Sequence, residues 1–147
     1  MNYKRILLGG LVAGVIINAS EFLLNGVVLA TQMQADLARH NLTMAGWAMP
    51  FYVLMAFVLG LALAWIYAAI RPRFGAGFRT SLIAAAVVWS LAYVLPTVGL
   101  LAMGAGDTSS YLLALVWGAA ELVIAAAVAG YFYHELEAPA TQTAPAP

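Results

Sequence analysis

Residues 6–30 read ILLGGLVAGVIINASEFLLNGVVLA, an apolar run interrupted by a single charged residue, Glu21. A transmembrane α-helix needs about 20 such residues, so the run is long enough to cross a bilayer. Lys4 and Arg5 precede it, as basic residues precede the apolar core of a signal peptide. The run is longer than the usual core of about 7–15 residues, and INASE is a poor small-x-small cleavage site. We therefore expect an uncleaved transmembrane helix.

The composition of the whole chain agrees with a membrane setting. Of its 147 residues, 65% are hydrophobic and 8% are charged, whereas a soluble domain carries about 25% charged residues. The sequence therefore predicts an all-α protein, a four-helix transmembrane bundle over residues 1–137. A Pro/Ala/Thr tail over residues 138–147 has nothing to bury and is expected to be disordered. The predicted spans are residues 6–30, 50–70, 80–103 and 111–133.

The composition also excludes several classes of chemistry. The chain has no cysteine, which rules out disulfides, thiol catalysis and cysteine-ligated metal sites. Its formal net charge is zero and it has no long basic run, so nucleic acid is not an expected partner. No serine, histidine and acid fall at one membrane depth to form hydrolytic machinery. We expect a protein that is not an enzyme and carries no cofactor or metal.

The basic residues indicate how the bundle is oriented. On one side they are Lys4, Arg5, Arg71, Arg73 and Arg79. The other side has only Arg39. By the positive-inside rule, both termini and the short loop between the second and third spans are expected in the cytoplasm. Pro72 is expected to end the second helix, after which Gly75 and Gly77 allow the chain to reverse.

The two connections on the other side differ in length. In the longer one, Met33 and Leu37 lie one turn apart, while Asp36 and His40 share a different face, which predicts a short amphipathic helix on the outer surface. Asp36 and His40 are more often a solvated pair than a metal site. In the shorter connection, Asp107, Thr108 and Ser109 are candidates for the N-cap of the last helix.

The first span carries a stripe of polar and small residues. Gly14, Asn18, Glu21 and Asn25 follow a 4-3-4 spacing and therefore share one face of the helix. Gly10 and Gly14 form a G-x-x-x-G pair on much the same side, which lets a second helix approach closely. This stripe is therefore expected to face protein rather than lipid.

The fourth span carries a second intramembrane acid, Glu121, close to Gly118. With a rise of about 1.5 Å per residue, Glu21 and Glu121 both fall about 14–15 Å below the outer boundary, near the membrane centre. Tyr93 of the third span reaches a similar level, and Pro96, one turn further, is expected to kink that helix. A common depth makes contact possible among Glu21, Glu121, Asn18 and Tyr93.

Two interpretations of this polar cluster remain open. Two carboxyls together in a low dielectric repel each other, so at least one is expected to hold a proton and donate a hydrogen bond. The pair could then bind a proton or a cation, since intramembrane acids often mark such pathways. Alternatively, a protonated carboxyl bonds Asn18, Asn25 or a backbone carbonyl and only holds helices together. The second interpretation is favoured, because no third acid or buried base completes a relay.

Two segments, YKRILLGGLVAGVIINASEFLLNGVVL (3–29) and WIYAAIRPRFGAGFRTSLIAAAVVWSLAYVLP (65–96), resemble a group of uncharacterised small bacterial four-span integral membrane proteins. The resemblance covers nearly the whole chain apart from the tail. These proteins have no assigned activity, so the resemblance implies only the topology and a location in the bacterial inner membrane.

The functional prediction is a non-enzymatic integral membrane protein. Its small size and small-residue helix faces at Gly10, Gly14 and Gly118 favour an accessory or interaction subunit that packs against itself or another membrane protein. The alternative is a small oligomeric transporter or channel, in which Glu21 and Glu121 bind a proton or cation.

Overall fold

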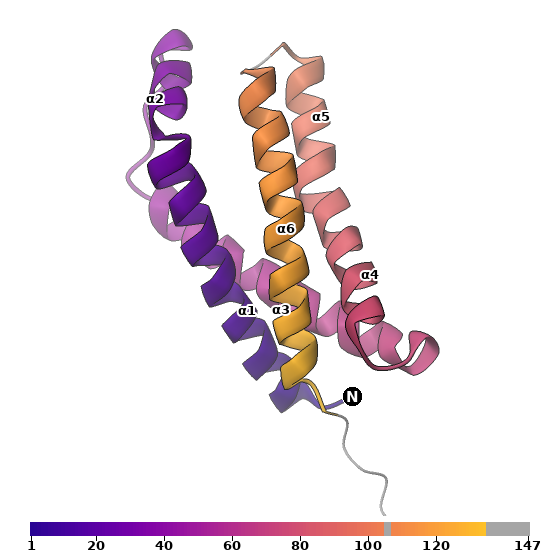
Figure 1. Ribbon diagram of the computed structural model, residues 1–147. Helices are drawn as coiled ribbons and strands as arrows, with labels where there is room; N and C mark the ends of the chain where they lie inside the picture. The colour runs from indigo at the N-terminus through magenta and orange to yellow at the C-terminus, as the bar shows by residue number, and fades with distance from the viewer. Residues whose placement is uncertain (105–106, 135–147) are drawn as a thin grey trace, which may run out of the picture.

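The computed structural model describes residues 1–104 and 107–134, and these form helices joined by short connections, with no strand among them (Figure 1). The predicted disordered tail, residues 138–147, lies outside the described residues. Two elements, η1 and η2, are single π-helical turns inside longer helices. The elements are α1 (Tyr3–Leu23), η1 (Leu24–Val28), α2 (Ala30–Arg39), α3 (Ala48–Phe74), α4 (Phe78–Trp89), η2 (Ser90–Val94), α5 (Leu95–Ala102) and α6 (Thr108–Phe132).

Four helical stretches are long and apolar enough to cross a membrane. They begin and end within a few residues of the predicted spans, so the all-α four-helix transmembrane bundle is confirmed. The protein is an integral membrane protein. The four stretches are Tyr3–Val28, Ala48–Phe74, Phe78–Ala102 and Thr108–Phe132.

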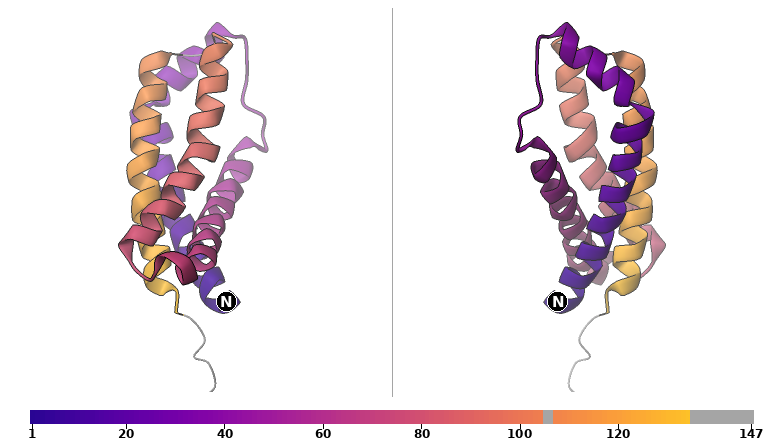
Figure 2. Two further views of the ribbon diagram at one scale, coloured as in Figure 1. Left: turned by 90° about the vertical axis from the view of Figure 1, so that its right-hand side faces the viewer. Right: turned by 90° about the vertical axis from the view of Figure 1, so that its left-hand side faces the viewer.

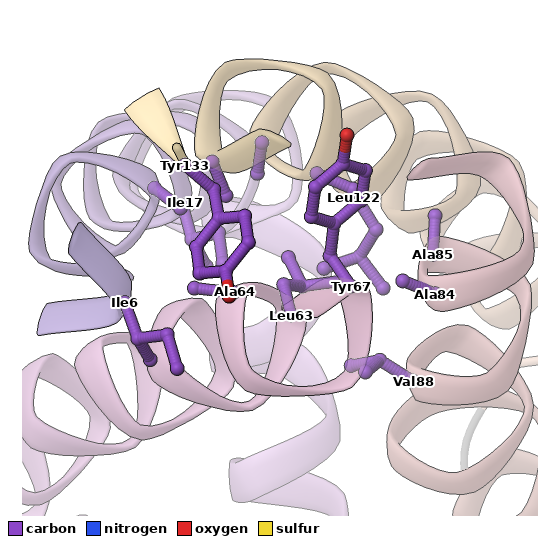
Figure 3. Close-up of a cluster of buried hydrophobic side chains, with 14 of the residues drawn as sticks. Ile6, Ile17, Leu63, Ala64, Tyr67, Ala84, Ala85, Val88, Leu122 and Tyr133 are labelled. Carbon is purple, nitrogen blue, oxygen red and sulfur yellow. The ribbon is translucent and has the colours of Figure 1, made fainter. Parts of the chain in front are cut away.

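The interior of the bundle is built from small and branched side chains, which gather between the helices (Figure 3). Many of the fully buried residues are alanines, such as Ala13, Ala84 and Ala126, and the large buried side chains include Ile17 and Leu63. Lipid tails are as apolar as leucine, so helices in a membrane associate through close packing of small residues rather than by hiding large ones. Large apolar side chains accordingly cover the outside of all four spans.

The closest helix approach is between α1 and α3. An added Cβ on Gly60 of α3 would lie 2.4 Å from the carbonyl oxygen of Gly10 and 2.4 Å from the nitrogen of Gly14. Only glycine at all three positions lets the two backbones come this near. The G-x-x-x-G face of the first span therefore packs inside the chain, and its partner is α3.

The prediction that Pro72 ends the second helix is wrong, because α3 continues through it to Phe74. A proline in the last turn removes only one helical hydrogen bond, the one to the carbonyl of Ala68. The helix ends instead at Gly75, which has φ 85° and donates its N–H to the carbonyl of Arg71. The reversal is then fixed by Thr80, whose hydroxyl donates to the Gly75 carbonyl at 2.7 Å.

The short helix predicted in the longer connection is α2. The chain turns at Leu29, and α2 lies across the end of the bundle opposite the N-terminus (Figure 2). No residue of α2 is buried. Asp36 pairs with Arg39 at 3.1 Å on the exposed surface, rather than with His40. From α2 the chain descends along the outside before α3 begins (Figure 2).

Candidate functional site

The polar residues of the first and third spans stand at or beside π-helical turns. Asn25 belongs to η1, which follows Glu21 closely, and Tyr93 belongs to η2. The turn at η2 precedes Pro96, which has no N–H to donate to the carbonyl of Ala92 and so disrupts regular α-helical bonding there. A π-helical turn, η2, stands just before the proline at which the kink is predicted. Such turns re-aim side chains and occur frequently at functional sites.

The hydroxyl of Tyr93 joins the two intramembrane acids. Its Oη lies 2.7 Å from Oε1 of Glu21 and 2.8 Å from Oε1 of Glu121. We call these three residues the carboxyl–tyrosine triad. They come from α1, η2 and α6, so the triad connects three of the four spans.

The two short contacts of the Tyr93 hydroxyl limit how many hydrogens the triad holds. A tyrosine hydroxyl has one hydrogen to donate, and an ionised carboxylate can only accept. Tyr93 can therefore donate to one carboxyl, and the other short contact is a hydrogen bond only if that carboxyl carries a proton and donates to Oη. The geometry of the triad thus fits one proton more than the tyrosine's own, shared between Glu21 and Glu121.

Glu21 has an additional partner on its own helix. The side-chain amide of Asn25 donates to Oε2 of Glu21 at 2.5 Å and to the Glu21 carbonyl at 3.2 Å. Since Oε2 accepts from an amide, a proton on Glu21 belongs on Oε1, the oxygen that faces Tyr93. Glu21, Asn25 and Tyr93 are all partly exposed.

Glu121 is the buried member of the triad, with 4% of its surface exposed. Its Oε2 is buried and has no hydrogen-bond partner among the described residues. Beside it lies Ser20, whose Oγ accepts a hydrogen bond from the indole N–H of Trp117 at 2.8 Å. An unpaired carboxyl oxygen in an apolar interior is costly, so the Ser20 hydroxyl beside this carboxyl, which can turn to donate to it, offsets part of that cost.

Two neighbours of the triad were not among the predicted site residues, namely Ser20 and Trp117. Ser20 precedes Glu21 and Trp117 lies one turn before Glu121, and both are polar groups within apolar spans. Their polar side chains next to the two acids are visible in the sequence. The pairing itself depends on how α1 and α6 are rotated toward each other.

The remaining predicted residues have other roles. Asn18 does not reach the triad, because its amide donates to the carbonyl of Gly14 at 2.9 Å and to that of Val53 on α3 at 3.3 Å. Gly118 makes room for the ring of Tyr93, since an added Cβ there would lie 2.6 Å from the ring carbons. Gly10 and Gly14 pack against α3 and lie outside the triad.

No basic side chain of the described residues neutralises the two acids. Lysine and arginine occur only in the first or last turn of a span, or in α2, and the histidines lie outside the spans. The described residues also contain no group of three or more His, Cys, Asp or Glu side chains that could hold a metal ion. The candidate site is thus a pair of acids that relies on a proton or a bound cation for charge balance.

The prediction of an N-cap at the start of the last span is confirmed, because Asp107 caps α6 and accepts from the N–H of Ser110 at 2.9 Å. Hydrogen bonds from the hydroxyl of Ser109 and from the N–H of Ser110 hold the pKa of Asp107 below its usual value. This exposed carboxyl acts on the helix terminus and lies far along α6 from Glu121.

Comparisons with models of protein families, with curated proteins and with solved structures gave no match.

Proposed function

We propose that this protein binds a proton or a monovalent cation within the membrane, between Glu21 and Glu121, and that it acts as a small transporter or channel. The observation that carries this proposal is the shared hydroxyl of Tyr93, 2.7 and 2.8 Å from the two carboxyls, with no basic residue of the described spans nearby. Intramembrane acids held in this way are typical of ion and proton pathways.

Two further observations support ion binding over a purely structural role. Helix contacts need only hydrogen bonds, and an amide in place of either acid would supply them without a titratable proton. The spans instead hold two acids, Glu21 and Glu121, and Oε2 of Glu121 is buried without a hydrogen-bond partner among the described residues. A site that exchanges a proton or cation needs such an atom, whereas a structural contact gains nothing from it.

The small-residue faces no longer favour an accessory role. Apart from the small size of the chain, the sequence argument for an interaction subunit uses Gly10, Gly14 and Gly118 as surfaces for a partner. Gly10 and Gly14 are covered by α3, and Gly118 is covered by Tyr93. These faces are used within the chain, so they do not argue for a partner.

The membrane setting is proposed on the sequence evidence. The distribution of basic residues favours cytoplasmic termini, and the resemblance to small bacterial four-span proteins favours the bacterial inner membrane. Four helices leave little room for a water-filled path, so transport is proposed to require a homodimer or a larger oligomer.

The test compares proton and sodium uptake by proteoliposomes that contain the wild-type protein, Glu21→Gln or Glu121→Gln. Both substitutions retain hydrogen-bonding capacity, so we expect folded protein with the ion-dependent uptake lost. The matched control is Asp36→Asn, which makes the same chemical change at the exposed α2 surface and should leave uptake unchanged. Wild-type vesicles that take up neither ion faster than empty ones would contradict the proposal.

An interaction subunit remains the second candidate, and a different surface favours it. Leu42, Met44 and Trp47 follow α2 and expose 60%, 45% and 67% of their surface. A partner protein could cover this exposed connection. Mass measurement in mild detergent separates the candidates: a heterocomplex that dissociates on Trp47→Ala supports the interaction subunit, and a homo-oligomer supports the transporter.

A further inference from the structure

The three members of the triad differ in how far the bundle covers them. Glu121 is buried, with 4% of its surface exposed, whereas Glu21 and Tyr93 are partly exposed. From Glu121, one hydrogen bond leads to Tyr93 at 2.8 Å, and the hydroxyl of Ser20 lies beside the carboxyl as a second partner. From Tyr93 the next contact is Glu21 at 2.7 Å. The three oxygens therefore form a single file from a partly exposed acid to a buried one.

From this single file we propose that the bound species is a proton and that Tyr93 passes it between Glu21 and Glu121. The inference rests on the proposed function, because it specifies the ion and the route at the same site. Glu21 is the exchanging acid, Tyr93 the relay, and Glu121 the buried acceptor.

The step balances without any other reactant. With Glu21 protonated and Glu121 ionised, the Oη–H bond of Tyr93 breaks and its proton bonds to Oε1 of Glu121. The proton on Oε1 of Glu21 bonds to Oη at the same time. The tyrosine is a neutral phenol before and after the step. One proton has moved from Glu21 to Glu121, and the negative charge has moved the other way.

The oxygen spacing favours a proton over a metal cation. Separations of 2.7 and 2.8 Å lie at the usual distance of O–H···O hydrogen bonds, so each gap is filled by one hydrogen. A cation would have to separate these oxygens and gather several ligands around one point. The acids and histidines of the described residues offer no group of three for that purpose.

The charged and titratable groups around the relay are few. Among the charged and titratable side chains of the described residues, Glu21 of α1 and Glu121 of α6 contact it. From α3 comes a carbonyl, that of Val53, which accepts from Asn18 nearby. The ring of Tyr93 rests on Gly118. Replacing the hydroxyl alone, as in Tyr93→Phe, keeps that ring contact and interrupts the file.

The test follows hydrogen–deuterium exchange of the protonated carboxyl by infrared spectroscopy in lipid vesicles. The carboxylic C=O band shifts when its proton is replaced by deuterium, and loss of the band in Glu121→Gln assigns it to the buried acid. We expect Tyr93→Phe to slow exchange at Glu121 by about 100-fold, a typical effect of removing a positioned proton-transfer group. Tyr131→Phe, at a tyrosine that is 77% exposed, is the matched control and should exchange like the wild type.

A second variant keeps the test valid if Tyr93→Phe does not fold. Glu21→Gln keeps Tyr93 but removes the acid from which the relay takes its proton, so it should also slow exchange at Glu121. If the Glu121 carboxyl of either folded variant exchanges hydrogen for deuterium as fast as in the wild type, the proposed relay is wrong.

The remaining outcomes separate the relay from the proposed function. Loss of the carboxylic band on addition of sodium would show that a cation displaces the proton, which overturns this inference but retains the ion site. A wild-type protein with no carboxylic band and no response to sodium would contradict both the relay and the proposed ion-binding function. A band that persists, exchanges through Tyr93 and ignores sodium supports both.

Discussion

Gly118 shows how one missing side chain positions the whole triad. Its Cα faces the ring of Tyr93, and an added Cβ would lie 2.6 Å from two ring carbons. The hydroxyl reaches both acids because the ring can come close to the backbone of α6 at this glycine. Gly118 therefore acts on the site through Tyr93, without touching either carboxyl.

We predict that Gly118→Ala displaces Tyr93 and breaks at least one of its two carboxyl contacts. Overpacking of this kind costs about 1–3 kcal/mol of folding free energy. The expected readouts are a lower melting temperature in detergent and a changed exchange rate of the carboxyl proton. Gly99→Ala is the matched control, because no atom lies within 4 Å of an added Cβ there. A melting temperature equal to that of the control would contradict the prediction.

Individual positions show where sequence reasoning stops. The similar depths of Glu21 and Glu121 follow from counting residues at a fixed rise along a helix. Asn18 shares a face with Glu21 in the sequence pattern, yet it bonds backbone carbonyls of Gly14 and Val53. Which side chains meet depends on the rotation and tilt of each helix. Those are set by packing among all four spans, and no local pattern records them.

At the scale of single helices, α1 and α3 depend on each other through Gly60. The glycine pair of α1 was visible as a motif, but its partner in α3 is a lone glycine that carries no motif. Close packing at this crossing replaces the hydrophobic driving force that a soluble bundle would use.

We predict that Gly60→Ala destabilises the bundle more than any other single added methyl group at a helical glycine. Its Cβ would lie 2.4 Å from backbone atoms of Gly10 and Gly14, which cannot rotate away as a side chain can. We expect a cost of about 3 kcal/mol, the upper end for overpacking. Thermal unfolding in detergent measures it against Gly99→Ala, and stability equal to that variant would contradict the close crossing.

The stabilisation of the protein by the Asp107 cap of α6 is expected to depend on pH. Because hydrogen bonds hold the pKa of Asp107 below its usual value in the folded protein, its contribution to stability is present above that usual value. It is lost as the pH falls through the lowered pKa of the folded state. The difference in melting temperature between the wild type and Asp107→Ala should therefore shrink as the pH is lowered from neutral through the pKa of Asp107 in the folded protein. A difference that stays constant with pH would show that the cap does not depend on the charge.

The whole molecule was the easiest scale to predict, because the bilayer itself sets the length of each span. Composition and the position of charges gave four helices and the short α2. The ends of the helices were harder: Pro72 does not stop α3, because a proline in the last turn removes so little. The two π-helical turns could not be read from the sequence, although Pro96 indicated that the third span is irregular near Tyr93.

The orientation of the bundle is predicted from its basic residues. Both termini are expected in the cytoplasm, since five of the six lysines and arginines lie at that end. A reporter that is active only in the cytoplasm, fused after residue 147, should be active. The same reporter inserted in the segment that follows α2 should be silent. The reverse pattern of activity would show that the bundle has the opposite orientation in the membrane.

The triad has no basic neighbour among the described residues, and this has an electrical consequence. Glu121 stands near the midpoint of α6, so a proton that reaches it from either face crosses about half of the membrane potential. A full crossing by one charge corresponds to about 2.3 kcal/mol per 100 mV. Half of that, about 1 kcal/mol, changes the ratio of protonated to ionised protein several-fold. The voltage across the membrane would therefore set the charge state of this protein as directly as the pH on either side.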